Sequence, residues 1–567
     1  MSTSKYHEFI PKSIQYLKDY SFTTFQKDLL AGLTVGVIAL PLAMAFAIAS
    51  GVQPERGLFT AIIAGFIISA LGGSRYQVGG PTGAFVVIIY DIMNRTGYEG
   101  LCASMLVAAI LLIMLGVLRL GSWIKYVPHP LVMGFTSGIA VIIFSSQVKD
   151  FFGLKMGSVP ADFIEKWIAF AKAFPTISWP TFAMGTGTLI LIVVMRIFTP
   201  RIPWGIVSIV VATAVSLLLH LPIDTVASRF GEIPQTLPLP AFPAFTWMEG
   251  QMHEIFLDGV TIALLAGIES LLSAVIADGM TGGRHRSNCE LIAQGAANLG
   301  SLLFGGIPAT GAIARTAANI KMGAQTPVSG MIHAVTLLLV MAFFAPIVSD
   351  VPLAALAAVL FMISWNMSEA PHFIRLLKAP MDDRIVLLAS FLLTVFVDIT
   401  AAIMFGMILA SLFFMKRMSV ISKTVCLTKI FQETGYDFPE KSDPESISKK
   451  QVPAGVEVYE IQGPFFFGAA DLLRDLLATL EKPPKVFILR LRYVPMIDAS
   501  GSHALKEFYD RCQKHKTVLL LSGVHGQNMC DLHDFGLDFM VGKNNIFPHI
   551  DAALDRAQSI LADCQIS

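Results

Sequence analysis

Gly79-Gly80-Pro81-Thr82-Gly83-Ala84-Phe85 is a stretch that this chain contains a second time, in altered form, as Gly305-Gly306-Ile307-Pro308-Ala309-Thr310-Gly311-Ala312-Ile313. Each copy stands before a short apolar segment, and the copies lie about 228 residues apart. Nearly the same offset separates Leu33-Thr34-Val35 from Val260-Thr261-Ile262. Glycine and proline breaks in matching positions are typical of inverted repeats whose broken helices form a transporter's substrate site. On the motif alone, ordinary loops between spans remain an alternative.

Apolar segments surround both motifs, and a helix needs roughly 20 apolar residues to cross a bilayer. The longer candidates are 29–50, 57–71, 101–118, 129–147, 183–198, 204–220, 255–277, 327–348, 382–397 and 399–415. Shorter or glycine-rich candidates are 82–93, 288–304, 311–320 and 353–366. We therefore predict an α-helical polytopic membrane protein with about 14 membrane segments over 27–417. Seven segments per half, an odd number, would give 7+7 inverted repeats over about 27–220 and 252–417.

The composition supports one large membrane domain and one small globular domain. Of the 567 residues, 54% are hydrophobic and 14% are charged, whereas a soluble chain would carry roughly a quarter charged residues. Charges are sparse from Leu29 to Met415 and ordinary from Lys416 onward. The formal net charge is zero, so nothing indicates a nucleic-acid partner.

The distribution of lysine and arginine predicts the orientation, because cytoplasmic loops carry an excess of both. The segment 1–26 lacks the apolar core of a signal peptide, so we expect it to be a cytoplasmic N-terminal segment. With the N-terminus inside and an even number of crossings, the C-terminus is cytoplasmic too. We predict a multi-pass protein of the cell inner membrane. The connections placed inside carry Arg75, Arg119, Lys125, Arg196, Arg201, Arg284, Arg286, Lys321, Arg375, Lys378, Arg384, Lys416 and Arg417.

After the last apolar segment the pattern changes to that of a soluble α/β domain. Residues 418–452 are polar and are interpreted as a linker, and 453–567 alternate between strand and helix patterns. The predicted strands are 456–461, 485–491 and 517–521. The predicted helices are 469–480, 502–512, 527–535 and 547–561.

The two broken helices predict an anion site. Each helix start carries partial positive charge and N–H groups without intrahelical partners. Starts at Thr82-Gly83-Ala84 and Gly311-Ala312-Ile313 that meet in mid-membrane would bind an anion through backbone groups. Thr82 and Thr310 add hydroxyl donors. Arg315, about one turn into the second broken helix, would either strengthen anion attraction, or pair with a carboxylate or extend toward the membrane surface.

Glu269 is an ionisable residue in the middle of a predicted span, flanked by Ser270 and Ser273. A charge at the bilayer centre costs about 2.5–3.5 kcal/mol, so we expect Glu269 to face a cavity and to take up a proton. Its predicted role, with Ser270 and Ser273, is proton coupling; the alternative is a structural hydrogen bond to a broken helix. The chain has no phosphate-binding loop for ATP. The six scattered cysteines predict no metal site, and we expect no cofactor beyond the coupling ion, H+.

Five stretches resemble the sulfate permease (SulP) family of anion transporters: Leu40–Ala47, Gly80–Gly83, Gly267–Ser273, Asp278–Gly282 and Asn288–Gly295. The resemblance extends from about residue 25 to the C-terminus. It implies a core and a gate domain, a homodimer, and an elevator-like movement. It also places the substrate between the third and tenth helices, with Phe46 closing the pocket. Ala314 stands where mammalian relatives carry serine, which leaves the anion contacts there open.

Some runs are more similar to the enteric members of the family that carry dicarboxylic acids, Trp365–Ala370 among them. Sodium-coupled bicarbonate relatives carry Asp at the position of Glu269, and Glu suits protons better. We therefore expect proton-coupled uptake of C4-dicarboxylates. Proton- or sodium-coupled sulfate or bicarbonate transport is the alternative within transport, and a membrane-anchored anion sensor or scaffold is the alternative outside it. No catalytic dyad or metal-spaced histidines appear in the spans, so we expect no enzyme.

The C-terminal part resembles a STAS domain, the module named for sulfate transporters and anti-sigma antagonists. Met496–Gly501 matches the turn at which soluble relatives are phosphorylated, at the position of Ser500. Independently of this resemblance, Ser500 is a good candidate for a helix N-cap. We expect the domain to support dimerisation or to bind a cytoplasmic protein partner.

Overall fold

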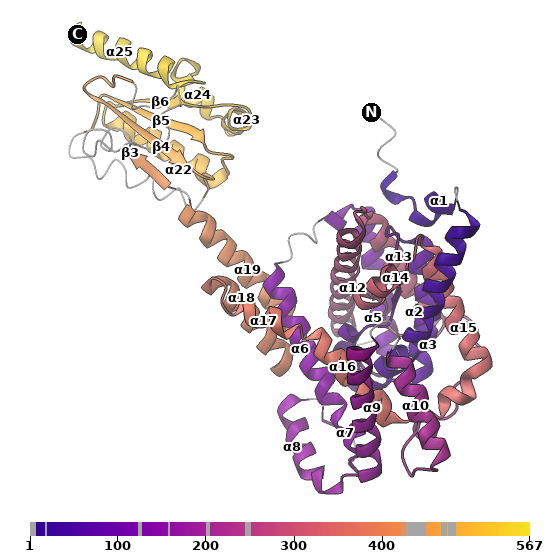
Figure 1. Ribbon diagram of the computed structural model, residues 1–567. Helices are drawn as coiled ribbons and strands as arrows, with labels where there is room; N and C mark the ends of the chain where they lie inside the picture. The colour runs from indigo at the N-terminus through magenta and orange to yellow at the C-terminus, as the bar shows by residue number, and fades with distance from the viewer. Residues whose placement is uncertain are drawn as a thin grey trace. The chain divides into compact units, whose positions relative to one another are not determined.

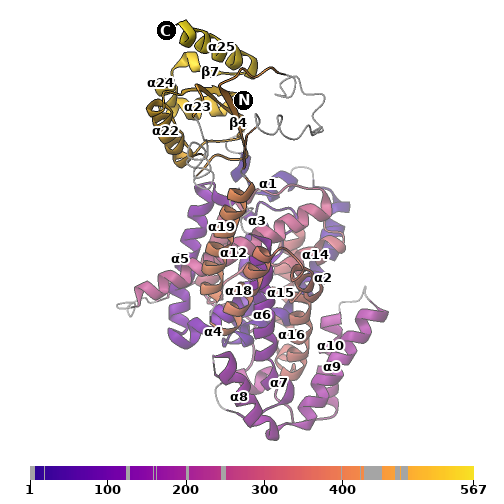
Figure 2. The same ribbon diagram turned by 90° about the vertical axis from the view of Figure 1, so that its left-hand side faces the viewer.

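The computed structural model describes residues 7–17, 20–122, 128–156, 159–160, 162–199, 204–243, 251–397, 399–421, 423–426, 450–466, 473 and 483–566. Within these residues, nine helices are long and apolar enough to cross a membrane. The chain divides into two units, Met1–Ile408 and Leu409–Ser567. The first unit is helical, and the second is built on a sheet (Figures 1 and 2).

The first half of the membrane unit contains seven predicted segments, and the structure has an element at each. They are α2 (Phe22–Ala49), α3 (Pro54–Leu71), the broken element β1 (Gly79–Gly80), η2 (Gly83–Phe85) and α4 (Val86–Arg95), then α5 (Gly97–Val117), α6 (His129–Ser146) followed by α7 (Val148–Phe152), α9 (Trp179–Phe198) and α10 (Trp204–Leu218). Pro81 lies between β1 and η2. Proline has no N–H to give to a helix ladder, which explains an extended chain at this point.

The second half repeats this order. Its elements are α12 (Met252–Thr281), α13 (Ser287–Leu303), the broken element β2 (Thr310–Gly311) and α14 (Ile313–Lys321), then α15 (Val328–Ser349), α16 (Leu353–Met367), α18 (Met381–Phe396) and α19 (Ile399–Ile421). Short helices connect these elements: α1 (Lys12–Leu17), α8 (Phe163–Ala173), α11 (Val226–Phe230) and α17 (Ala370–Leu376). The prediction of about fourteen membrane segments, seven in each half, is confirmed.

Packing divides the membrane helices into two sets. In the first set α2, α3, α5, α12, α13, α14 and α15 pack on one another, and in the second set α6, α7, α9, α10, α16 and α18 do so. Glycines allow the closest approaches in the first set. A Cβ at Gly57 of α3 would lie 2.0 Å from the Ala43 carbonyl oxygen of α2, and one at Gly295 of α13 would lie 2.6 Å from the Ala109 carbonyl oxygen of α5. Small residues at such contacts are usual between membrane helices, where packing drives association.

The second unit is a five-stranded sheet of order β3-β4-β5-β6-β7, in which β3 is antiparallel and the other strands are parallel. Its strands are β3 (Lys423–Cys426), β4 (Val456–Gln462), β5 (Val486–Tyr493), β6 (Val518–Ser522) and β7 (Ile546–Phe547). Its helices are α22 (Ala499–Lys514), α23 (Gln527–Asp534), α24 (Leu537–Val541) and α25 (Ile550–Ile566). Phe487 packs with α22 on one face and Ile488 with α25 on the other (Figure 1). Successive residues of a strand point to opposite faces, so both faces of the sheet are buried.

Three parts of this unit differ from the sequence prediction or fall outside the described residues. The interpretation of 418–452 as a linker is wrong in part, because α19 continues to Ile421 and β3 pairs with β4 as the edge of the sheet. The short strand β7 and helix α24 were not predicted. The predicted helix 469–480 falls outside the described residues except at Leu473.

Candidate functional site

The site begins where the two broken elements cross. β1 and β2 pair antiparallel, with Gly79 opposite Gly311 and Gly80 opposite Thr310. The Ala312 N–H extends the pairing by donating to the Val78 carbonyl oxygen at 2.9 Å. Because the strands run in opposite directions, α4 and α14 lead away from the crossing in opposite directions. This is the arrangement that inverted repeats produce.

Both helix starts at the crossing lack side-chain caps. Thr82 precedes η2 and Ala312 precedes α14, and neither side chain accepts a hydrogen bond from the helix that follows. Gly83 and Ala84 are buried, whereas Ile313 and Ala314 are exposed at the start of α14. Backbone N–H groups at an uncapped helix start, together with the helix dipole, favour a bound anion. The pairing of Gly79-Gly80 with Thr310-Gly311 brings the two helix starts to one crossing, and anion binding by Thr82-Gly83-Ala84 and Gly311-Ala312-Ile313 stays a prediction.

Glu269 of α12 reaches this crossing. The Thr82 hydroxyl donates to Oε2 of Glu269 at 3.0 Å. Glu269 is half-buried, so its carboxyl group is neither sealed in the packing nor free in solvent. Within the described residues, no cation lies at ion-pair distance from it. A carboxylate in this position can exchange a proton while it contacts a helix start.

Phe46 of α2 lies on the other side of Gly83. A Cβ at Gly83 would lie 3.3 Å from Phe46 Cε1, 3.0 Å from Ile143 Cδ1 of α6 and 3.2 Å from Met367 Sδ of α16. The Phe46 side chain is 6% exposed. The glycine therefore leaves room between α2 of the first helix set and α6 and α16 of the second set, and Phe46 covers it from one side.

Arg315 does not have the position that direct anion contact would require. Its side chain is 3% exposed, and its guanidinium donates to the Gly79 carbonyl oxygen at 3.3 Å and to the Pro81 carbonyl oxygen. Both acceptors belong to the opposite broken element. In this structure Arg315 joins the two broken elements through the backbone, and neither sequence-based interpretation anticipated that role.

Ser270 and Ser273 face the packing rather than Glu269. Ser270 accepts from Gln77 Nε2 at 2.9 Å and donates to Glu290 Oε1 at 3.2 Å. Ser273 donates to the Thr316 hydroxyl at 3.1 Å. Gln77 was not among the predicted site residues, although a polar residue two positions before a Gly-Gly-Pro break was an available signal. These bonds fix α12 against both broken elements.

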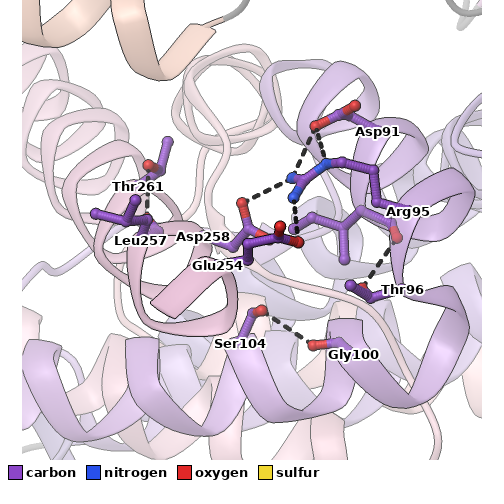
Figure 3. Close-up of polar contacts among 10 residues, drawn as sticks. Asp91, Arg95, Thr96, Gly100, Ser104, Glu254, Leu257, Asp258 and Thr261 are labelled. Carbon is purple, nitrogen blue, oxygen red and sulfur yellow. Dashed lines mark hydrogen bonds and ion pairs between the residues drawn. The ribbon is translucent and has the colours of Figure 1, made fainter. Parts of the chain in front are cut away.

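Two aspartates fix the far ends of the broken helices. Asp28 of α2 accepts from the backbone N–H groups of Gln325 and Thr326, just after α14, at 2.6 and 3.0 Å. Asp258 of α12 accepts from Arg95 at the end of α4 at 2.9 Å. Figure 3 shows that Asp91 and Glu254 also surround this arginine, at 2.8 and 3.5 Å. Each broken helix is thereby tied to the first helix of the other half.

Ser500 is not the N-cap of its helix. Asp498 has that role, since its Oδ1 accepts from the Gly501 N–H at 2.7 Å. Ser500 is the second residue of α22 and its side chain is exposed. Asp498 rather than Ser500 is the cap because an N-cap oxygen bonds to the N–H two or three residues later, and Gly501 is three residues after Asp498.

No group of three or more His, Cys, Asp or Glu residues within the described ranges could hold a metal ion.

In the second unit, burial raises the pKa of Cys512 to about 12, which makes its thiol unreactive near neutral pH.

Comparison with known proteins places the chain in a family. The pattern of the sulfate permease family matches residues 25–390, and that of the STAS domain matches residues 448–553. YvdB of Bacillus subtilis, a protein named for sulfate transport, is 41% identical over 94% of this chain and 98% of its own length. The bicarbonate transporter BicA of Picosynechococcus is 29% identical over 91% of each chain.

Solved structures agree on the fold. The murine anion transporter Slc26a9, described as inward-facing, superposes with a TM-score of 0.85 over 98% of this chain and 96% of its own, at 20% identity. The transmembrane domain of a cyanobacterial BicA matches with a TM-score of 0.60 over 69% of this chain and 98% of its own, at 30% identity. The chain belongs to the sulfate permease family, whose members carry a helical transport domain, and it has a C-terminal STAS domain.

Proposed function

We propose that this chain is a secondary transporter that moves a small oxyanion, sulfate or bicarbonate, across the membrane, with Glu269 carrying the coupling proton. The observation that carries the proposal is the 3.0 Å hydrogen bond from Thr82 to Glu269 at the meeting point of two broken helices. A helix start that can hold an anion and a carboxyl group that can hold a proton then share one residue. Binding of one can change the binding of the other through that residue.

The relatives support the anion class. YvdB and BicA are named for sulfate and bicarbonate, and both match this chain over more than nine-tenths of its length. The expectation of C4-dicarboxylates, made from short sequence runs, has no support among these relatives and is kept as a competitor to be tested. Uncapped backbone N–H groups recognise charge more than shape, so they do not separate these anions.

Coupling follows from the energy of moving charge. Bringing a dianion into a cell with an interior 100 mV negative costs about 4.6 kcal/mol. Protons that move with the anion offset this cost, which is the role we assign to Glu269. We further propose an elevator-like movement of the first helix set against the second, a homodimer, an inner-membrane location with both termini cytoplasmic, and a STAS domain that binds a cytoplasmic protein.

The test is uptake of labelled sulfate, bicarbonate and succinate into proteoliposomes under an imposed inward proton gradient. We expect uptake of sulfate or bicarbonate in the unsubstituted protein and its loss in Glu269→Gln. Glu254→Gln is the matched control, because Glu254 lies on the same helix but at its start, in the Arg95 cluster (Figure 3). It should keep gradient-driven uptake.

Gradient-driven succinate uptake without sulfate or bicarbonate uptake would replace the oxyanion assignment by a dicarboxylate. Full activity of Glu269→Gln would remove the assigned coupling residue. Binding of an anion without any uptake would favour a membrane-anchored sensor.

A further inference from the structure

The short helix α8 connects the two helix sets close to the candidate site. The Tyr90 hydroxyl of α4 donates to the Val159 carbonyl oxygen, just before α8, at 2.9 Å. Trp167 of α8 donates from Nε1 to the Ser145 hydroxyl of α6 at 3.2 Å. Phe163 of α8 meets Phe396 of α18 edge to face, with ring centroids 5.6 Å apart. Helix α8, together with Val159 just before it, therefore contacts α4, α6 and α18.

The two helix contacts differ in their relation to Gly83. On α6, Ser145 stands two residues after Ile143, the side chain beside Gly83, so it points to the opposite face of that helix. On α4, Tyr90 stands seven residues beyond Gly83, or about 10 Å along the helix. Helix α8 lies beside α7 and α9 at the end of the membrane unit (Figure 1). Val159, just before α8, contacts α4 and Trp167 contacts α6, so α8 lies beside both helices.

Lys166 lies on the face of α8 that is turned toward Tyr90 of α4. Its side chain is 4% exposed, and Phe170, one turn later on the same face, is 3% exposed. The Lys166 ammonium lies 5.7 Å from the centroid of the Tyr90 ring. Lys172, further along the same helix, is exposed. The buried lysine therefore faces α4, whereas its neighbour on the helix faces away.

Within the described ranges, no carboxylate forms an ion pair with Lys166. Asp162 is the acidic residue that acts on it, and its Oδ1 already accepts the backbone N–H groups of Ile164 and Glu165. Burial lowers the pKa of Lys166 from its usual value. A buried ammonium without a carboxylate partner is costly. An anion that passes between α4 and α6 would supply the missing negative charge.

We propose that Lys166 is a binding residue for the transported anion on its path between the Gly83 site and the α8 side of the membrane. The proposal rests on the proposed function, and it adds a side-chain cation to a site built otherwise from backbone groups. Because Lys166 lies on one side only, its contribution is to binding from that side. A dianion such as sulfate should depend on it more than bicarbonate does.

The experiment measures the half-saturating concentration of sulfate and of bicarbonate in intact cells and in inside-out membrane vesicles. We expect Lys166→Met and Lys166→Gln to raise it about tenfold in one of the two preparations and to leave it unchanged in the other. The increase should be larger for sulfate. Lys166→Arg keeps the charge and should stay within about twofold of the unsubstituted protein, as should the matched control Lys172→Met.

A purely structural role would lower the maximal rate equally in both preparations, and that result would overturn the proposal. Unchanged half-saturation in both Lys166→Met and Lys166→Gln would overturn it as well, while leaving the proposed function intact. Absence of any sulfate or bicarbonate uptake by the unsubstituted protein would overturn the proposed function and this inference together.

Discussion

The two halves of the membrane unit share a backbone plan, but residues at matching positions differ either in type or in the contacts they make. Thr82 and Thr310 are such a pair, yet Thr82 donates to the Glu269 carboxylate and Thr310 donates to the Ala266 carbonyl oxygen at 2.8 Å. Arg315 belongs to the second half, and the position that matches it in the first half holds Val87. The backbone symmetry creates the crossing, whereas Glu269, the proposed coupling residue, and Arg315, which donates to the Gly79 and Pro81 carbonyl oxygens, both come from the second half.

The ties at the far ends show the same division. Asp28 is buried and accepts from backbone N–H groups and from the Thr326 hydroxyl. Asp258 binds a half-exposed arginine that it shares with two other carboxylates. One broken helix is therefore held by neutral donors in a dry environment, and the other by an ionic cluster in which Asp258 is buried and Arg95, Asp91 and Glu254 are partly exposed. The second tie should yield more readily to salt and to substitution.

The largest expected effect comes from removing the Arg315 guanidinium, which joins the two broken elements. Arg315→Met leaves the carbonyl oxygens of Gly79 and Pro81 without their donor in a buried site, which should destabilise the protein by about 3 kcal/mol. Val87→Met, at the matching position of the first half, should change stability by less than about 1 kcal/mol. Thermal unfolding of the purified full-length proteins in detergent measures both. Equal losses in the two variants would show that the halves are energetically equivalent here.

Alanine at the motif glycines should separate folding from transport. A Cβ at Gly311 would lie 1.6 Å from Gln77 Nε2, and Gln77 is already bonded to Ser270. We expect Gly311→Ala to cost about 2 kcal/mol of stability. At Gly83 the nearest atoms are ends of side chains that can shift, so Gly83→Ala should fold normally and raise the half-saturating anion concentration. A stable and fully active Gly311→Ala protein would contradict the close packing of Gly311 against Gln77.

The sequence predicted the membrane segments and the crossing because hydropathy and Gly-Pro breaks are local signals. All fourteen predicted segments have a counterpart, and both breaks lie at the strand pair. It could not predict the partner of Arg315, since the Gly79 and Pro81 carbonyl oxygens lie more than two hundred residues away in the chain. Every residue has a backbone carbonyl oxygen that can accept a hydrogen bond, so residue types give no signal of such a contact.

The small errors have the same cause. The edge strand β3 lies in a polar stretch, and it is a strand only because β4 offers an edge to pair with. Ser500 and Asp498 are both good N-cap residue types, and only the course of the backbone decides that Asp498 reaches Gly501. Burial also separates Lys166 from Lys172 on one helix, which composition alone does not reveal.

Substitutions of Asp28 and Asp258 should have a smaller effect on stability. They test the comparison between the buried contact and the partly exposed ionic cluster. Asp28→Asn weakens four hydrogen bonds, donated by the Tyr20 hydroxyl, the Gln325 and Thr326 N–H groups and the Thr326 hydroxyl, and we expect a loss of about 2 kcal/mol. Asp258→Asn should lose less than about 1 kcal/mol. High salt should reduce the difference between Asp258→Asn and the unsubstituted protein, since salt screens exposed ion pairs. Salt-sensitive unfolding of Asp28→Asn, with none in Asp258→Asn, would reverse the assignment.

The smallest effect on stability should have the largest functional contrast. Thr82→Val and Thr310→Val each remove one hydroxyl hydrogen bond, worth about 1 kcal/mol, so their unfolding temperatures should be similar. Only Thr82 bonds to Glu269, and only its loss separates the first helix start from the coupling carboxyl group. Gradient-driven uptake should therefore fall about tenfold in Thr82→Val and stay within about twofold in Thr310→Val. If both variants lost uptake equally, the hydroxyls would matter to the crossing as a whole, and the division of roles between the halves would have to be abandoned.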